Sequence, residues 1–425
     1  MSFPKAHKTT LPNGVRILVV PVKNNPTVTV QVFVATGARA EEKKLNGISH
    51  FLEHMCFKGT TRRPSAKIIS TELEALGASN NAFTSEEMTS YYAKARVEHF
   101  DKILDVIADL YLDPLLPAAD LERERGVIIE EINMYEDLPQ RTVHDLMDKL
   151  MYGDQPAGRT ILGPKENIKR FSRADFVKYR TANYVTSQTV VVIAGGIEAQ
   201  RALTEAKKYF GKIKKSKRAS YPKTRESQSK PDALFHEKKT GQTHMVIGFR
   251  AYALNDKRLP AASVLAAVLG NGMSSRLFQK LRDELGVCYY AKATHLTSTD
   301  SGQFKIFTGV DSTRVEEIVG VIMEEVRKVR DIEVPKEEVE KAKEILIGDI
   351  EMELESSDAF ALWYGGEETL RGKTETPEQV IAKIRKVTAK EVQKIARDLF
   401  QDKKLNLALI GPKTNEGKLK KLLKI

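Results

Sequence analysis

Two histidines and a glutamate lie close together in the segment HFLEHMCFKGT, which covers residues 50–60. His50 and His54 are four residues apart, and Glu53 lies between them. On an α-helix, residues i and i+4 share one face about one turn apart, so both imidazoles can point at one ion. Two imidazoles with a carboxylate nearby suit Zn²⁺, which takes nitrogen and oxygen ligands in a tetrahedral shell. The spacing therefore predicts a metal site.

A catalytic zinc site keeps one position for water and so requires a third protein ligand. The segment LERERGVIIEEINMYED, residues 121–137, supplies candidates. Glu124 and Glu131 are seven residues apart, two helical turns, and share a face, whereas Glu130 points elsewhere. The alternative is that these are unrelated surface residues. A chain with eight histidines contains the pattern His-x-x-Glu-His by chance in about one case in a hundred.

The two halves of the chain resemble each other, which indicates an internal duplication. Four elements recur in the same order: strand-like alternation at 27–41 and 243–256, an apolar helix after each, and the pairs 91–110 with 306–325 and 117–132 with 335–350. Strands occur in runs between helices, so we expect an α+β fold with two homologous lobes.

The second copy of the apolar helix is an internal control for the predicted metal site. When the two apolar helices are aligned, the polar trio of His50, Glu53 and His54 corresponds to Ser263, Ala266 and Ala267. The same helix therefore forms without the trio, and the trio is not needed to build it.

Basic charge is concentrated in one internal segment and at the C-terminus. The net charge is +11, but residues 207–230 hold ten Lys or Arg and one acidic residue, and residues 412–425 hold five Lys and one Glu. The rest of the chain is nearly neutral, so we expect no nucleic-acid partner; a linker that binds nucleic acid is the alternative. The polar segment 214–230 predicts a linker between a section 1–213 and a section 231–425.

The remaining composition indicates a cytoplasmic protein without a membrane partner. Cys56 and Cys288 are the only cysteines, which suits a reducing compartment. The first residues lack the apolar core of a signal peptide, and no apolar run is long enough to span a bilayer.

The segment HFLEHMCFKGT resembles the inverted zinc motif of the pitrilysin and mitochondrial-processing-peptidase family of metallopeptidases. The resemblance covers nearly the whole chain. It implies one zinc ion per chain, held by His50, His54 and Glu131, with Glu53 as the general base. The family's accessory glutamate falls on Glu124.

Two further segments resemble parts of the same family. LGASNNAFTSEEMTSYY, residues 76–92, is similar to its substrate-binding edge strand, which implies substrate contacts at Asn81, Ala82 and Phe83. GNGMSSRLFQKLRDELGVCYY, residues 270–290, is similar to a stretch with an Arg and a Tyr seven apart, here Arg282 and Tyr289. Tyr289 would stabilise the oxyanion, and Arg282 would orient the substrate or Tyr289.

The resemblance also implies a function and an architecture. Each lobe is expected to be a mainly antiparallel sheet packed with helices, and the two lobes to form a clamshell around a chamber. Section 1–213 would be the catalytic zinc-binding lobe, and section 231–425 the lobe without metal that completes the chamber. The expected activity is that of a zinc endopeptidase that cleaves peptides or unfolded segments, in a homodimer as in the short bacterial members. The alternative is a peptide-binding or assembly subunit that retains zinc and turns over little.

Overall fold

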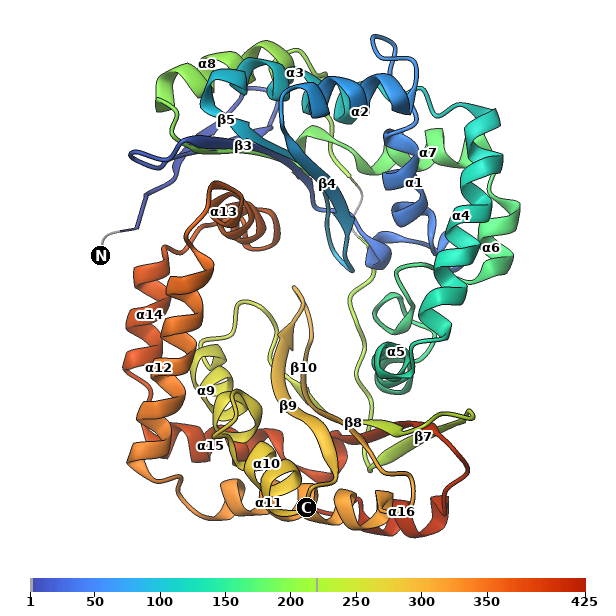
Figure 1. Ribbon diagram of the computed structural model, residues 1–425, viewed down its shortest axis with the longest axis vertical. Coiled ribbons are helices and arrows are strands. Elements are labelled where there is room, and N and C mark those ends of the chain that lie inside the picture. The colour runs from blue at the N-terminus through green and yellow to red at the C-terminus, as the bar shows by residue number, and fades with distance from the viewer. Residues whose placement is uncertain (1–2, 219–220) are drawn as a thin grey trace. The chain divides into compact units, whose positions relative to one another are not determined.

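The structure is a computed structural model that describes residues 3–218 and 221–425, so residues 219 and 220 of the predicted linker lie outside it. The chain forms two compact units. Among the described residues, unit 1 contains 3–132, 159–218, 221–222 and 352–377, and unit 2 contains 133–158, 223–351 and 378–425. Each unit has its own sheet and helices (Figure 1), so the predicted α+β class with two homologous lobes is confirmed.

Unit 1 is built on a six-stranded sheet in the order β1-β2-β6-β3-β5-β4. Only the β2–β6 pair is parallel; every other pair is antiparallel. The central strands β3 and β6 are buried along nearly their whole length, as expected for strands covered on both faces, and β6 contains a run of Val and Ile. The strands are β1 (His7–Thr10), β2 (Arg16–Pro21), β3 (Thr27–Val34), β4 (Ser79–Thr84), β5 (Thr89–Arg96) and β6 (Thr189–Gly195).

The helices of unit 1 cover this sheet. They are α1 (Ile48–Cys56), α2 (Ala66–Ala75), α3 (Phe100–Leu112), α4 (Ala118–Glu136), α6 (Lys165–Arg170), α7 (Arg173–Asn183), α8 (Ala199–Phe210) and α13 (Ser357–Arg371). The last turn of α4 passes into unit 2. A core of aliphatic and aromatic side chains joins β3, β5 and β6 to α1 and α3.

Unit 2 repeats the strand order without the first strand. Its sheet runs β7-β11-β8-β10-β9, with the β7–β11 pair parallel and the others antiparallel. The strands are β7 (Asp232–Glu237), β8 (Thr243–Ala251), β9 (Cys288–Thr297), β10 (Gly302–Val310) and β11 (Leu405–Gly411). The helices are α5 (Pro139–Tyr152), α9 (Leu259–Gly270), α10 (Arg276–Phe278), α11 (Val315–Asp331), α12 (Lys336–Glu353), α14 (Pro377–Arg385), α15 (Ala389–Leu399) and α16 (Glu416–Leu422). A π-helical turn, Gln279–Glu284, continues α10.

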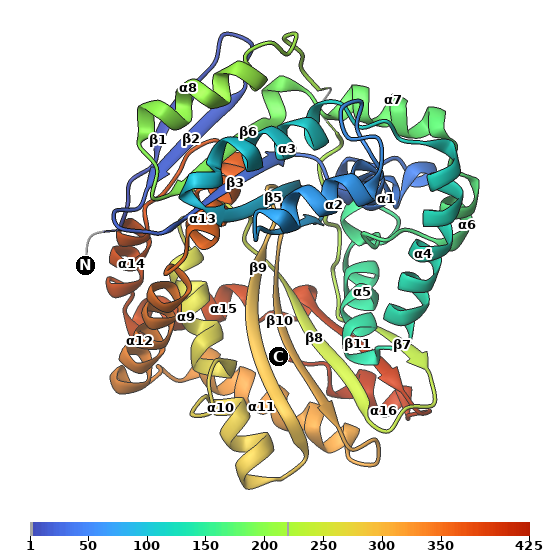
Figure 2. The same cartoon turned by 45° about the horizontal axis from the view of Figure 1, so that its top comes forward.

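The two halves of the chain exchange one helix each. The units therefore differ from the predicted sections 1–213 and 231–425. Helix α5, from the first half, packs on β8 and β11 of unit 2, and α13, from the second half, packs on β3 and β6 of unit 1 (Figures 1 and 2). In α13 the carboxylate of Glu368 is fully buried and pairs with Arg16 of β2 at 3.1 Å. Residues 1–213 alone therefore lack one helix of the unit that contains the predicted zinc ligands.

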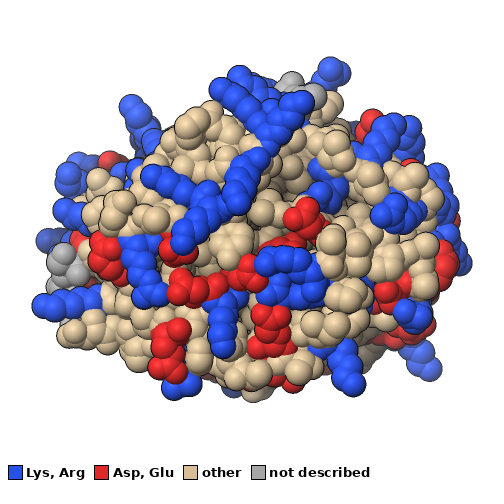
Figure 3. Space-filling model, turned by 90° about the horizontal axis from the view of Figure 1, so that it is seen from above, with Lys and Arg blue, Asp and Glu red and all other residues tan. Residues whose placement is uncertain are grey.

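The surface of unit 1 carries much of the basic charge seen in the sequence. Figure 3 looks down on this unit and shows Lys and Arg side chains gathered in a band above a belt of mixed charge. The exposed lysines near the end of α8 and after it include Lys207, Lys212, Lys214 and Lys215. In the described part of the chain, none of the helices combines the length and the apolar character that a membrane crossing requires.

Candidate metal centre

Helix α1 begins on a network that fixes its position. Gly47 precedes it in the left-handed region, with φ of 101°, where a Cβ would lie 2.4 Å from the carbonyl oxygen of Leu162. The buried carboxylate of Glu41 accepts hydrogen bonds at 2.8 Å from the backbone N–H groups of Gly47 and Ser49. These bonds satisfy N–H groups that a helix start leaves without partners. The first turn of α1, which contains His50, is thereby held in place.

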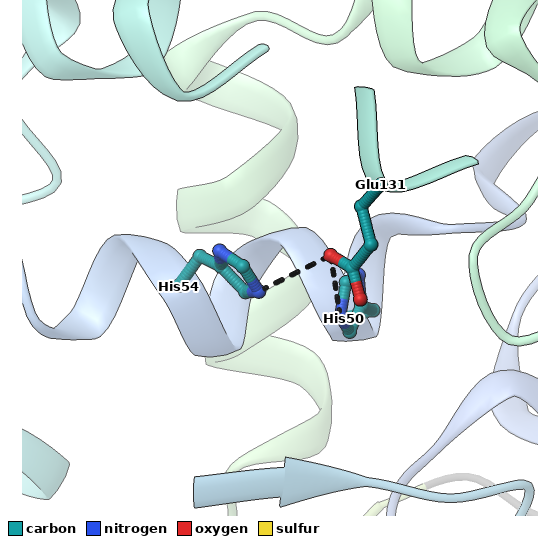
Figure 4. A group of neighbouring side chains, drawn as sticks. All are labelled: His50, His54 and Glu131. Atoms are coloured by element: carbon teal, nitrogen blue, oxygen red, sulfur yellow. Dashed lines mark ion pairs between the residues drawn. The ribbon is translucent and has the colours of Figure 1, made fainter. Parts of the chain in front are cut away.

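Helix α4 brings Glu131 to the two histidines of α1 (Figure 4). Its Oε2 lies 3.6 Å from Nε2 of His50 and 3.8 Å from Nε2 of His54. The three candidate ligand atoms all lie within 4.8 Å of one another. In a tetrahedral zinc site with bonds of about 2.0–2.1 Å, ligand atoms are about 3.3 Å apart. The observed spacing is therefore close to what one zinc ion requires.

Glu124 orients the second histidine from the other side. Its Oε1 accepts a hydrogen bond from Nδ1 of His54 at 2.9 Å, and its Oε2 pairs with Nζ of Lys58 at 2.5 Å. Because Nδ1 holds the proton, the Nε2 lone pair of His54 is left to face Glu131. Glu130 is exposed, as its helical phase predicts.

The charges and protonation of the cluster fit a divalent cation. Burial, then the charge of His54, lowers the pKa of His50 to about 3, so its imidazole is neutral at pH 7. Nδ1 of His50 is buried and has no hydrogen-bond partner among the described residues. The carboxyl groups of Glu124 and Glu131 lie beside the histidines, and Lys58 pairs with Glu124. The donor set of two imidazoles and a carboxylate matches zinc.

Glu53 lies beside the predicted ligands and contacts the sheet. It is 8% exposed, and its Oε2 accepts a hydrogen bond from Oγ1 of Thr84 at 2.6 Å. Burial raises the pKa of the Glu53 carboxyl to about 6, partly offset by that hydrogen bond. A carboxylate with a pKa nearer neutrality than usual is a competent general base.

The predicted substrate-binding residues lie on the free edge of the unit 1 sheet. Strand β4 is the last strand in the order, and it pairs only with β5 among the described strands. The backbone N–H of Ala82 donates a hydrogen bond of 2.9 Å to Oδ1 of Asn81. The ring of Phe83 packs edge-to-face on Phe33 with centroids 6.4 Å apart, on the opposite face of the strand from Ala82.

Arg282 and Tyr289 lie in unit 2 and contact each other. The Arg282 guanidinium donates a hydrogen bond to the Tyr289 carbonyl oxygen at 2.7 Å and lies 4.6 Å from the centre of its ring. The Tyr289 side chain is largely exposed. Both expected roles of Arg282 stay predictions.

Two residues of the site were missed in the sequence. Lys58 lies two residues beyond the end of α1, so helical spacing could not have indicated it. Thr84 lies 31 residues from Glu53. Its contact depends on the packing of β4 against α1, for which the sequence offers no local signal.

Comparison with known proteins identifies two family matches along the chain. Residues 16–165 match the family described as Insulinase (Peptidase family M16), and residues 170–346 match the one described as Peptidase M16 inactive domain. The first of these ranges contains His50, His54 and Glu131.

Two curated relatives match over nearly their whole length. A protein of Bacillus subtilis named as the uncharacterized zinc protease YmxG is 36% identical over 409 residues, which are 96% of this chain and 98% of that protein. The mitochondrial-processing peptidase subunit beta of Saccharomyces cerevisiae is 32% identical over 429 residues, 96% of this chain and 92% of that protein.

A solved structure shows the same fold. A protease from Helicobacter pylori aligns with a TM-score of 0.88 at 23% identity and covers 97% of this chain and all of its own. Identity of more than 30% over nearly the full length establishes descent as well as fold. The chain belongs to the M16 family of zinc proteases, which includes the pitrilysin and mitochondrial-processing peptidases.

Proposed function

We propose that this protein is a zinc-dependent endopeptidase that binds one zinc ion per chain and cleaves peptides or unfolded segments. The observation that carries the proposal is the cluster of His50, His54 and Glu131 with Glu53 beside it. A structural zinc site would be closed by four protein ligands. Here three candidate ligands adjoin a buried carboxylate, which supports a catalytic site.

In this proposal His50, His54 and Glu131 hold the ion, and Glu124 fixes the ring of His54. Zinc, when bound, supplies a Lewis acid that polarises the scissile carbonyl and makes a water more acidic. Glu53 takes a proton from the attacking water and delivers it to the departing amine. Burial of Glu53 supports this role because it favours a proton on the carboxyl between the two transfers.

The substrate would bind as an extended strand along β4. An added strand pairs through its backbone, and side-chain pockets set the selectivity. Strand β4 is short, lies at the sheet edge and contains Asn81, Ala82 and Phe83. This mode requires an unfolded segment, so folded proteins would be poor substrates.

Other parts of the proposal rest on the resemblance to the family. Tyr289 would stabilise the oxyanion, with Arg282 holding it, and the enclosing chamber, the homodimer and the cytoplasmic location stay predictions. The sections 1–213 and 231–425 also stay predictions as functional lobes, with helices α5 and α13 exchanged between them.

A peptide-library experiment tests the proposal. The purified full-length protein is incubated with a random peptide library, with and without a chelator, and the products are read by mass spectrometry. We expect cleavage that the chelator abolishes and that added zinc restores. Retained zinc with no cleavage of any peptide would refute the proposal and favour a binding or assembly subunit.

A further inference from the structure

The hydroxyl of Thr84 connects the free edge of the sheet to the buried carboxylate of Glu53. Thr84 is the last residue of β4, and its Oγ1 donates a hydrogen bond of 2.6 Å to Oε2 of Glu53. A hydrogen bond to a charged carboxylate is shorter and about twice as strong as one between neutral groups. Thr84 thus fixes the position of one oxygen of the Glu53 carboxylate.

The backbone of Thr84 points the other way, to the open edge. The N–H of Ser85 donates a hydrogen bond of 2.8 Å to the carbonyl of Met88, so these two residues hold the position of a hydrogen-bonded pair of the β4–β5 hairpin, while the Ser85 carbonyl accepts from the N–H of Ala38. In an antiparallel ladder such pairs alternate with pairs that are not hydrogen-bonded. Thr84, opposite Thr89, is in the second class, so its N–H and C=O face away from β5.

The side chain of Thr84 has little freedom to turn independently of the strand. A β-branched residue in a strand has few allowed χ1 rotamers. The facing Thr89 is fully buried, and its Oγ1 lies 3.4 Å from Oγ1 of Thr84. The Thr89 hydroxyl donates its proton to the carbonyl oxygen of Thr36 at 2.9 Å. The Thr84 proton is therefore directed to Glu53, and the strand's backbone sets the direction.

We propose that Thr84 is a positioning residue that orients the Glu53 carboxylate and transmits the alignment of a substrate strand on β4 to that base. The inference rests on the proposed peptidase function. A peptide that pairs along β4 orders the backbone of Thr84, and the hydroxyl then holds Glu53 in one orientation. The backbone recognises the peptide, whereas the hydroxyl acts only on the base.

Because the backbone and the hydroxyl of Thr84 have separate roles, removal of the hydroxyl should change kcat and leave KM nearly unchanged. Thr84→Val keeps the shape and the backbone but removes the donor, so we expect kcat to fall about 10–100-fold, the value of one hydrogen bond to a charged group. KM should stay within about twofold, because strand pairing is unchanged. Thr84→Ser retains the hydroxyl and should keep kcat within about threefold of the wild type.

The test measures kcat and KM of the full-length zinc-loaded protein on a peptide taken from the library experiment. Thr89→Val is the matched control, since it removes the facing hydroxyl without touching Glu53 and should leave kcat within about twofold. Bound zinc is measured for every variant and should match the wild type. The unfolding midpoint is also measured, because Thr89→Val removes the buried hydrogen bond to the Thr36 carbonyl and should lower that midpoint without changing kcat.

Three results would overturn the inference: unchanged kcat in Thr84→Val, an equal loss in Thr84→Ser, or an equal loss in Thr89→Val. The last two would show that packing, and not the hydroxyl, matters. A wild-type protein that cleaves nothing would instead refute the proposed function, and the inference with it.

Discussion

Helix α13 packs closely on the sheet of unit 1. Adding one methyl group should therefore have opposite effects on stability at two adjacent glycines of this helix. A Cβ added at Gly365 would lie 2.1 Å from Cε2 of Phe33, whereas one added at Gly366 would meet nothing within 4 Å. Phe33 is fully buried and packs on Phe83, so its ring cannot move aside. We predict that Gly365→Ala destabilises the protein and that Gly366→Ala stabilises it.

The magnitude follows from two opposed terms. Replacing a helical glycine with alanine stabilises by about 1 kcal/mol at either position. Overpacking a closed core costs about 1–3 kcal/mol, and the overlap at Gly365 of more than 1 Å with an aromatic ring argues for the upper end. The two variants should therefore differ by about 3 kcal/mol. In a unit of 150–250 residues, 1 kcal/mol shifts the midpoint by about 2–4 °C.

Thermal unfolding followed by circular dichroism, with both variants measured at one protein concentration, provides the assay. The midpoint of Gly366→Ala should rise by about 2–4 °C, and that of Gly365→Ala should fall below the wild type. Equal shifts in the two variants would refute the packing of α13 on β3. They would also remove the reason for expecting residues 1–213 to be incomplete.

Three further changes test the metal centre and unit 2. Glu131→Gln should lower zinc affinity far more than Glu130→Gln, measured by competition with a chromogenic chelator; equal affinities would contradict the ligand assignment. Lys58→Met should weaken zinc binding about 10–100-fold by releasing the carboxylate that orients His54, and wild-type affinity would exclude that role. In unit 2, burial, followed by the charge of Lys305, lowers the pKa of His144 to about 4. The unfolded chain, with a histidine pKa near 6.5, then binds the proton more tightly, so stability should fall as the pH drops from 6.5 to 4. In urea titrations at several pH values, His144→Gln should reduce the dependence of the free energy of unfolding on pH. An unchanged dependence would contradict this role of His144.

Local periodicity was sufficient to place the candidate ligands on two helix faces, whereas the choice of Glu131 as the third ligand came from the resemblance to the family. His50 and His54 are one turn apart on one helix, and the two-turn spacing of Glu124 and Glu131 placed both carboxylates on one face of another helix. The structure brings these residues to one place. Helical phase depends on neighbouring residues only, so it can be read without knowledge of the tertiary fold.

Contacts between distant elements were beyond the same reasoning. The hydrogen bond from Thr84 to Glu53 depends on how an edge strand lies on α1, and nothing near either residue indicates it. The exchange of α5 and α13 was also missed, because a duplication suggests two self-contained copies. The reciprocal exchange follows from the same duplication, since α4 and α12 are equivalent long helices and each leads to the helix that packs on the other sheet.

The most direct test of the central claim is a measurement of bound zinc and peptide turnover in one preparation of Glu53→Gln. The amide has nearly the size of the carboxylate and cannot accept the proton of water. We predict zinc content equal to that of the wild type and turnover reduced by about 10²–10⁴-fold, the usual contribution of a positioned general base. Turnover close to that of the wild type with zinc bound would contradict the role of Glu53 as the base.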